Sequence, residues 1–289
     1  MQRRQFIKNS LFGLTGMGVL SGLYAWQIEP FRLEFVQMPM PIKNLPKALV
    51  GKTLMQISDI HVGNRFKHQY IIDSFTKAKA YQPEFVVYTG DYISLHQGQV
   101  QWDKLSAVLN NAVTGKIATI GILGNHDYGK NWAQPEVAGT IANMLAEKNI
   151  QVLRNDNTEA AGLHFIGFDD YWGMNFQPEK AMSSFDPAKA TIVLCHNPDV
   201  CDLPVWGAYN SWILSGHTHG GQVKPPFLPP LILPVKNKQY AAGKYALSND
   251  RTLYINRALG HLWQVRFNVR PEITIFSLQQ AKLGEDMRM

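Results

Sequence analysis

Hydrophobic and polar positions alternate along residues 51–280 in a pattern typical of strands joined by helices. Short apolar runs predict buried strands, and apolar residues recurring every three to four positions predict amphipathic helices. The first part of this region predicts strand, helix, strand, helix and strand at Thr53–Ser58, His68–Tyr81, Glu84–Thr89, Val100–Ala112 and Ile117–Leu123. This βαβαβ order has a crossover helix between each pair of strands.

The second part of the region is richer in strands. Pro135 and Glu136 open one more predicted helix, which continues to about Asn149. Five short strands are predicted after it, at Leu163–Phe168, Thr191–Cys195, Trp212–Leu214, Thr252–Ile255 and Glu272–Phe276. Crossover helices in the first half and strands in the second predict a layered α/β sandwich.

The N-terminal residues have a different pattern. Three basic residues precede an uncharged stretch of 20 residues: Arg3, Arg4, Lys8 and then Asn9–Ile28. The segment "RRQFIK" resembles a twin-arginine export signal, and an ordinary signal anchor with a chance arginine pair is the alternative. No small-x-small cleavage site follows, and 20 uncharged residues are just enough to span a bilayer. The basic flank of such an anchor stays cytoplasmic.

These patterns divide the chain into four parts. We expect a signal or membrane anchor over residues 1–30, a linker with three prolines over 31–50, one domain over 51–280 and a tail over 281–289. The protein is therefore expected at a membrane. A working twin-arginine signal places the domain outside the cytoplasm, and otherwise it faces the cytoplasm.

Composition agrees with one large globular domain and an appendage. The 289 residues are 45% hydrophobic and 17% charged, which is enough apolar material for a sizeable core. The net charge of +6 suits an anionic partner such as phosphate groups or an acidic membrane surface. Because the basic residues are scattered, nucleic-acid binding is not expected, and no obligate protein partner is evident. The two cysteines make no disulfide framework.

Polar residues follow five of the predicted strands, at their carboxyl ends. These segments are Asp59-Ile-His61, Gly90-Asp91, Gly124-Asn-His-Asp127, His196 and "SGHTHGG" over residues 215–221. Taken singly, each is more often a turn, a cap or a hydrogen-bonded core residue. Ligand sites of α/β sheets lie outside the carboxyl ends of the strands, so the conjunction predicts one common cavity.

The side chains at these strand ends are metal ligands by type. Seven are candidates: Asp59, His61, Asp91, Asn125, His196, His217 and His219. Imidazole, carboxylate and amide donors without a thiolate suit Mn²⁺, Fe or Zn²⁺. Seven ligands exceed the needs of one ion, whereas two ions bridged by one carboxylate use them all. Histidines on either side of Thr218 can then point at different ions, while the neighbouring glycines permit close backbone approach.

The order D-x-H, G-D, G-N-H-[DE], H and G-H-x-H resembles the calcineurin-like metallophosphoesterases, and the resemblance runs from about Gly51 to Leu278. It implies a four-layer αββα sandwich. It also implies one metal held by Asp59, His61 and His219, and another held by Asn125, His196 and His217, with Asp91 bridging. In the same comparison His126 faces the leaving group and Asp127 orients His126.

The resemblance implies in-line attack on a phosphodiester or pyrophosphate by a hydroxide held between two divalent ions, Mn²⁺ first and Fe or Zn²⁺ as alternatives. Three segments, "SGHTHGGQV", "QYAAGKY" and "RFNVRPEI", are similar to a membrane-associated subgroup that includes enzymes cleaving UDP-2,3-diacylglucosamine in lipid A synthesis. A lipid- or nucleotide-linked substrate is therefore expected. A phosphatase of small soluble monoesters and a non-catalytic metal-binding scaffold are the alternatives.

The segment Lys224–Gln239 places apolar residues among five prolines. Two interpretations are open for its apolar residues Phe227, Leu228, Leu231, Ile232 and Leu233. They form either a lipid-facing lip beside the metal site or a stiff loop packed on the sandwich.

Overall fold

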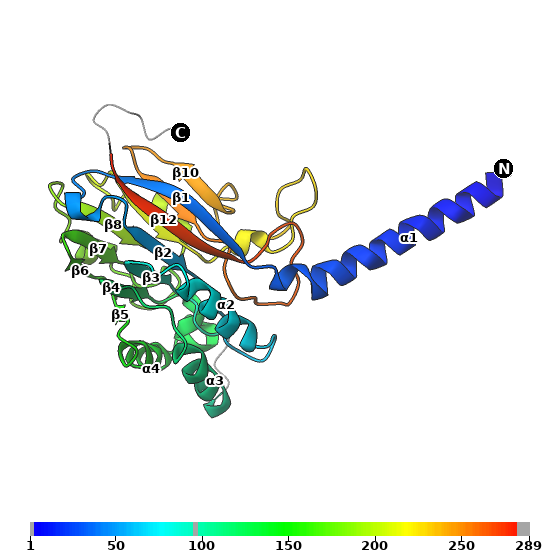
Figure 1. Cartoon of the computed structure of the whole chain (residues 1–289), viewed down its shortest axis with the longest axis horizontal. Helices are drawn as coiled ribbons and strands as arrows, with labels where there is room; N and C mark the ends of the chain where they lie inside the picture. The colour runs from blue at the N-terminus through cyan, green and yellow to red at the C-terminus, as the bar shows by residue number, and fades with distance from the viewer. Residues whose placement is uncertain (1–2, 95–97, 282–289) are drawn as a thin grey trace.

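Two six-stranded β-sheets are stacked at the centre of the computed structural model, which describes residues 3–94 and 98–281 (Figure 1). In spatial order the first sheet contains β1 (Glu34–Ile42), β12 (Glu272–Gln280), β2 (Thr53–Ile57), β3 (Phe85–Thr89), β4 (Ala118–Ile122) and β5 (Gln151–Val152). The second contains β10 (Gly243–Ala246), β11 (Thr252–Ile255), β9 (Trp212–Ser215), β8 (Ala190–Leu194), β7 (Leu163–Gly167) and β6 (Asp156–Ala160).

The strands that lead to the candidate ligands are parallel within each sheet. β2, β3 and β4 pair in parallel in the first sheet, and β8 and β9 do so in the second. Their carboxyl ends therefore reach the same edge of each sheet. β12 is antiparallel to β2, and the outer strands β10 and β6 are antiparallel to their neighbours.

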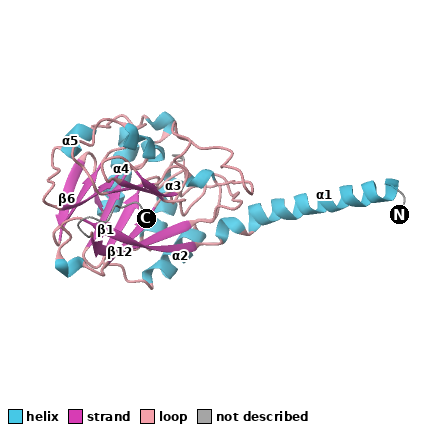
Figure 2. Ribbon diagram, turned by 90° about the horizontal axis from the view of Figure 1, so that it is seen from above, coloured by secondary structure: helices cyan, strands magenta, loops and turns pink. Residues whose placement is uncertain are grey.

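Helices cover the outer face of the first sheet. They are α2 (Gln69–Lys79), α3 (Gln99–Leu109) and α4 (Pro135–Ala146), and Figure 2 shows them with the strands of both sheets. Phe75, Leu105 and Ile141 of these helices join Val86 and Tyr88 in one buried cluster. The helices are amphipathic, so burying their apolar faces on the sheet holds them there.

The space between the two sheets is filled by a second apolar cluster. Leu54, Val87 and Ile122 come from the first sheet, and Phe165 and Leu194 come from the second. The outer face of the second sheet has a thinner cover of α5 (Pro178–Met182), a 3₁₀ helix at Pro198–Asp202 and loops. These layers confirm the αββα sandwich expected from the sequence.

Every strand and helix predicted between residues 51 and 280 is present, with ends shifted by a few residues. Four strands and one helix were not predicted: β1, β5, β6, β10 and α5. The missed strands β5, β6 and β10 have partly buried or exposed residues, so they lack the continuous apolar run that predicted the buried strands. Helix α5 has only five residues, too few for a helical period to show.

The prediction of a linker over residues 31–50 was wrong. Nine of these residues form strand β1, which pairs in parallel with β12. The backbone N–H of Glu34 donates to the carbonyl of Pro271. Even-numbered residues of β1 therefore turn their N–H groups toward β12, and odd-numbered residues turn theirs to the open edge. Pro39 and Pro41 lack an N–H only on that open edge, where proline is tolerated.

Helix α1 (Arg3–Gln27) extends away from the sandwich (Figure 1). Within the part of the chain that the structure describes, one helical segment is long enough and apolar enough to cross a bilayer, and it consists of α1 and the turn that follows. Only 6% of the most apolar 18 residues of this segment are buried in the protein. A 3₁₀ turn at Glu29–Phe31 follows, and the buried Glu29 carboxylate accepts the N–H of Val269 at 2.6 Å. The end of α1 is thus attached to the domain.

If β1 belongs to the domain core, truncating Met40 destabilises the whole domain. Met40 is completely buried between the sheets, so Met40→Ala is expected to lower the free energy of unfolding by about 2 to 5 kcal/mol. Urea denaturation of the full chain measures this. Val50→Ala, at an exposed position, is the control and should change stability by less than about 0.5 kcal/mol. Equal effects of the two changes would contradict the placement of β1.

Candidate metal centre

Five strand ends from the two sheets meet at one buried site. β2, β3 and β4 lead to Asp59, Asp91 and Asn125, while β8 and β9 lead to His196 and His217. All of these side chains are buried, as are His61 and His219. The sequence prediction that these residues share a cavity therefore agrees with their positions in the fold.

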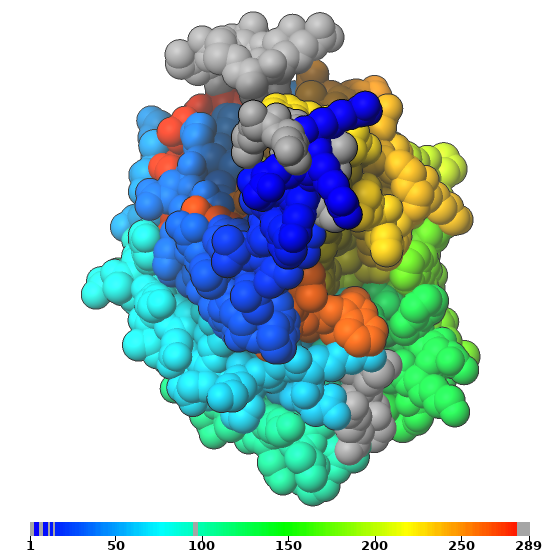
Figure 3. All heavy atoms as spheres, turned by 90° about the vertical axis from the view of Figure 1, so that its right-hand side faces the viewer, coloured from blue at the N-terminus to red at the C-terminus, as the bar shows by residue number. Residues whose placement is uncertain are grey.

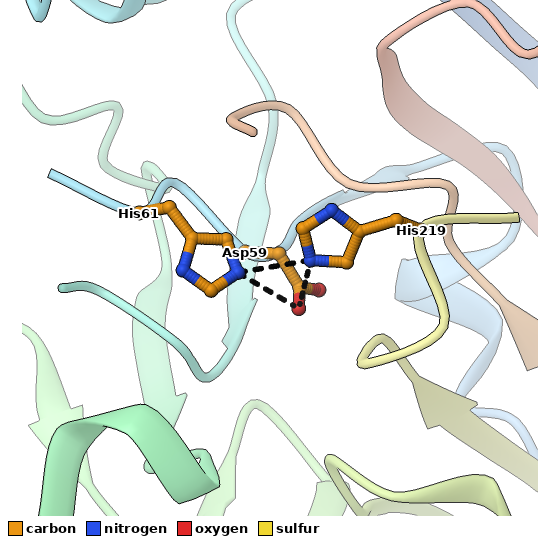
Figure 4. Close-up of side chains that lie close together, drawn as sticks. All are labelled: Asp59, His61 and His219. Atoms are coloured by element: carbon orange, nitrogen blue, oxygen red, sulfur yellow. Dashed lines mark hydrogen bonds and ion pairs between the residues drawn. The ribbon is translucent and has the colours of Figure 1, made fainter. Parts of the chain in front are cut away.

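Asp59, His61 and His219 form the first cluster, shown in Figure 4. The Nε2 atoms of His61 and His219 are 2.9 Å apart, and Asp59 Oδ1 lies 3.3 Å from His219 Nε2 and 3.8 Å from His61 Nε2. Asp59 and His61 come from the loop after β2, and His219 comes from the loop after β9, 158 positions beyond His61. A cation between them would satisfy all three lone pairs at once.

Asp91, His196 and His217 form the second cluster. His196 Nε2 lies 3.2 Å from Asp91 Oδ2 and 3.3 Å from His217 Nδ1. Asp91 Oδ2 also lies 3.6 Å from His61 Nε2 of the first cluster. The same carboxylate oxygen therefore stands between the two groups of ligands, as a bridging ligand requires.

Asn125 supplies a further sign that the site fits a cation. Its side-chain oxygen is buried and has no hydrogen-bond partner among the described residues. A buried acceptor without a donor costs roughly 1 to 3 kcal/mol. An amide oxygen is a ligand that hard divalent ions accept, so the donor set and this orphaned atom fit a two-metal site.

Three of the four histidines are oriented by an acceptor on their outer nitrogen. The pairs are His196 Nδ1 with Thr89 O at 2.7 Å, His217 Nε2 with Pro234 O at 2.8 Å, and His219 Nδ1 with Gln222 Oε1 at 3.1 Å. Each outer nitrogen donates its proton to the acceptor, so the inner nitrogen is the one that would bind a metal.

The backbone of the site is strained. Asp59, His61, Asp91, His217 and His219, five of the seven candidate ligands, have positive φ values between 47° and 70°. Such conformations cost roughly 1 to 3 kcal/mol for a residue with a side chain, and they gather where function requires a particular geometry. The surrounding sheets hold these residues in place.

Two glycines let the carboxylates approach the backbone. A Cβ atom at Gly216 would lie 2.2 Å from Asp59 Oδ2, and one at Gly124 would lie 2.3 Å from Asp91 Oδ1. No larger residue fits at either position unless the carboxylate moves. Gly216 is one of the glycines beside His217 and His219 that were predicted to permit close backbone approach, and the structure shows that approach.

Burial and charge together set the protonation of the site. Burial acts to raise the pKa of Asp59, but the hydrogen bond from His219 and the charge of His196 outweigh it and lower that pKa to about 2. Burial and the charge of His196 lower the pKa of His217 to about 3. Burial acts to lower the pKa of His196, but Asp91 raises that pKa well above its ordinary value. At neutral pH Asp59 is therefore anionic and His217 is neutral.

His126 and Asp127 were expected to work as a pair, and their contacts differ from that expectation. His126 lies edge-on to the His61 ring, with centroids 5.0 Å apart, and its backbone N–H donates to Asp91 Oδ1. Its Nδ1 contacts the carbonyl of Ser94, which takes the orienting role assigned to Asp127. Asp127 instead accepts backbone N–H groups of Gly124, Asp91 and Tyr92 at 2.8 to 2.9 Å. Its carboxylate thus holds the ligand loops together.

Sequence reasoning missed two polar residues near the clusters. Gln222 follows the histidine pair directly and orients His219, and its position in "SGHTHGGQV" was the available signal. Asp170 follows β7 at a further strand end, is fully buried, and has one oxygen without a partner among the described residues. Burial raises the pKa of Asp170 to about 7.

Two aromatic residues in the loops near the ligands differ in position: Trp172 lies at the site, whereas Tyr128 lies in the core. The Trp172 ring lies edge-on to His217 at 4.5 Å and stacks on Trp132. Tyr128 is completely buried and donates a hydrogen bond to Asp169. Tyr171 packs partly buried against the outer apolar cluster of the second sheet.

The site contains two clusters of buried carboxylate and imidazole donors, and one carboxylate joins them. Both clusters lie at the strand ends of an αββα sandwich. This combination is typical of a metal-dependent hydrolase. The family model of the calcineurin-like phosphoesterases matches residues 52–221, more than half of the chain. The protein belongs to the calcineurin-like phosphoesterase family and is a metallophosphoesterase.

Relatives match over most of their length. An uncharacterized metallophosphoesterase of Bacillus subtilis, YkuE, is 29% identical, with 97% of this chain and 99% of the relative covered. The UDP-2,3-diacylglucosamine pyrophosphatase LpxG of Chlamydia muridarum is 24% identical, with 92% and 95% covered. The phosphodiesterase YaeI of Escherichia coli is 29% identical, with 78% and 81% covered.

Metal binding is expected to stabilise the fold strongly, because the ions neutralise buried carboxylates. Each bound Mn²⁺ ion, at a thousand times its dissociation constant, should add about 4 kcal/mol to the free energy of unfolding of the metal-free protein. Each ion should therefore raise Tm by roughly 8 to 16 °C. Thermal unfolding after chelation and re-addition of Mn²⁺ measures it. An equal rise in a His61→Ala, His219→Ala double variant would show that the ions act elsewhere.

Removing the shared carboxylate should affect both clusters. Asp91→Ala is expected to lower the metal content from two ions per chain to one or fewer, because Asp91 Oδ2 faces His61 and His196 together. Elemental analysis of protein reconstituted with Mn²⁺ gives the stoichiometry. Asp156→Ala, an exposed carboxylate on β6, is the matched control and should retain both ions. Two ions in the Asp91 variant would exclude the bridging position.

Proposed function

We propose that the protein is a membrane-attached binuclear phosphodiesterase or pyrophosphatase whose substrate is a lipid-linked phosphate ester such as UDP-2,3-diacylglucosamine. The observation that carries the lipid-linked substrate is the short connection between the metal centre and the end of α1. Arg266 N–H donates to Ala25 O at 2.8 Å, and Gln222 Nε2 donates to the neighbouring Val265 O at 2.9 Å. Gln222 in turn orients the candidate ligand His219.

This connection places the reacting centre near the point where an apolar helix leaves the domain. A helix anchored in a bilayer would hold the site close to the lipid headgroups, where a phosphate linked to a lipid resides. LpxG relatives support the same substrate class, since they match this chain over 92 to 93% of its length and are named for UDP-2,3-diacylglucosamine. The net charge of +6 suits an anionic surface.

The residues of the two clusters would hold two divalent ions, and Mn²⁺ is the ion we propose. Bound there, such ions supply Lewis acidity toward the phosphoryl oxygens and lower the pKa of water. Asp59 and Asp91 contribute negative charge, and the oriented histidines contribute neutral nitrogens. His126, whose ring lies beside His61, is placed to give a proton to the departing oxygen.

A substrate comparison tests the proposal. The purified full-length chain in Mn²⁺ is assayed against UDP-2,3-diacylglucosamine, a phospholipid and a soluble aryl phosphodiester. Cleavage of the diester and a higher kcat/KM for a lipid-linked substrate are expected. Hydrolysis of small soluble monoesters alone, with full activity after deletion of residues 1–30, would instead identify a soluble phosphatase. Metal binding without hydrolysis of any of these esters would identify a scaffold.

The side of the membrane is tested separately by a reporter fused after residue 289. The twin-arginine-like start leads us to propose that the domain lies outside the cytoplasm, attached by residues 1–30, where its substrate is a lipid-linked phosphate ester. A reporter active only outside the cytoplasm is then expected to be active. Activity of a cytoplasmic reporter at the same position would reverse this assignment. UDP-2,3-diacylglucosamine is made on the cytoplasmic face, so it is the substrate only if the domain faces the cytoplasm.

His126→Ala should separate proton transfer from metal binding. General acid catalysis contributes roughly 100- to 10,000-fold, so kcat on an alkyl diester, a poor leaving group, should fall at least 100-fold. The loss should be much smaller for an aryl diester, and the metal content should remain two ions per chain. His68→Ala, at the start of α2, is the control. Unchanged turnover of the alkyl diester would refute this role.

A further inference from the structure

An apolar cavity lies directly against the metal centre. It has a volume of about 400 Å³, within the usual range for small-molecule sites, and the candidate ligands His217 and His219 form part of its wall. The remaining wall comes from two loops, with Val223, Leu231, Ile232, Leu262, Trp263 and Val265 as its apolar members. A ligand with its phosphate at the metals would therefore have this cavity beside it.

The polar groups of the wall are already paired within the protein. Gln222 donates from Nε2 to the carbonyls of Trp263 and Val265, and its Oε1 accepts from His219 and from the N–H of Leu262. Thr218 donates its hydroxyl to the carbonyl of Ala241. An apolar occupant would leave these hydrogen bonds intact, whereas a polar one would find few free partners.

The outer rim of the cavity exposes large apolar side chains. The exposed fraction is 67% for Leu231, 77% for Ile232 and 64% for Trp263, and the neighbouring Phe227 and Leu228 are also exposed. Single exposed apolar residues are common, but a contiguous group marks an interaction surface. Two interpretations of the apolar residues in segment 224–239 were open, a lipid-facing lip and a loop packed on the sandwich. Four of the five residues are exposed, as a lip requires, and only Leu233 is buried.

The rim is continuous with the end of the membrane helix candidate. Tyr24 of α1 and Phe227 of the rim line the same surface hollow, together with Glu29 and Phe267. Figure 3 shows this side of the molecule, where the yellow and orange atoms of the two loops lie next to the blue helix. A bilayer that holds α1 would thus meet the rim.

Basic side chains stand beside the apolar rim. The guanidinium of Arg65 lies 4.0 Å from the ring centroid of Trp263 and donates to the carbonyl of Leu262. Lys224 is exposed at the start of the proline-rich loop. Apolar side chains flanked by cations match an interface between acyl chains and anionic headgroups.

We propose that the cavity beside His217 and His219 binds an acyl chain, and that its rim of Phe227, Leu228, Leu231, Ile232 and Trp263 rests in the membrane interface. The lipid substrate then enters sideways from the bilayer, with its chain in the cavity and its phosphate at the metal ligands. This inference rests on the proposed phosphoesterase function and specifies where the lipid part of the substrate is held.

Chain length tests the acyl site. The full chain in lipid nanodiscs with Mn²⁺ is given nitrophenyl phosphodiesters whose second ester group is methyl, butyl, octyl or dodecyl, each below its critical micelle concentration. The leaving group is the same throughout, so kcat/KM reports binding of the chain. We expect kcat/KM to rise at least tenfold from methyl to dodecyl. A flat series would overturn the acyl site.

Paired variants assign the effect to the rim. In Leu231→Asp and Ile232→Asp, kcat/KM should fall far more for the dodecyl diester than for the methyl diester, which flattens the series. Val100→Asp, at an exposed apolar position on α3 away from the rim, should keep the full dependence on chain length. An unchanged series in both rim variants would mean that the chain binds elsewhere on the protein.

Membrane contact is measured without catalysis. Lipids with brominated chains quench tryptophan fluorescence, so the quenching in nanodiscs should fall in Trp263→Phe and remain in Trp132→Phe. Equal quenching in the two variants would overturn the membrane contact of the rim. If even the unmodified protein does not hydrolyse the methyl diester, the proposed phosphoesterase function is wrong. Quenching by brominated lipids then still tests whether the rim contacts the membrane. Quenching by a brominated alkyl phosphonate still tests whether the cavity binds an alkyl chain.

Discussion

Two buried carboxylates, Asp59 and Asp91, impose the constraint on which the rest of the structure depends. Ionised carboxylates inside a protein are stable only when positive charge and hydrogen bonds compensate them. Four imidazoles and several backbone N–H groups surround the pair, and burial of the whole group makes each contact stronger than it would be in water. Divalent cations complete that compensation, which is why a metal-dependent activity follows from the electrostatics of the site as well as from its family.

The two-sheet sandwich brings the compensating side chains to these two carboxylates. Parallel strands in each sheet deliver their carboxyl ends to one edge, so residues up to 160 positions apart in the chain face each other without long loops. The strained backbone at five candidate ligands is held by this framework, and Gly124 and Gly216 leave room for the carboxylates. Outer acceptors such as Thr89 O and Gln222 Oε1 then fix the imidazole rings.

The same framework connects the site to the N-terminal helix. Gln222 touches His219 on one side and the loop before Arg266 on the other, and that loop bonds to the end of α1. An apolar cavity lies between these contacts and opens on an exposed apolar rim. The candidate ligands, the cavity and the helix therefore form one continuous region, which is the basis for the lipid-linked substrate that we propose.

The sequence by itself determined the strongly periodic elements, the layered class of fold and the set of candidate ligands, because periodicity and strand-end position are local properties of the chain. Only the tertiary structure decided that β1 joins the first sheet, since the proline positions are acceptable solely on an open edge beside β12. It also decided that Ser94 contacts His126 while Asp127 holds the ligand loops. These outcomes depend on contacts between distant segments, which no local pattern of residues contains.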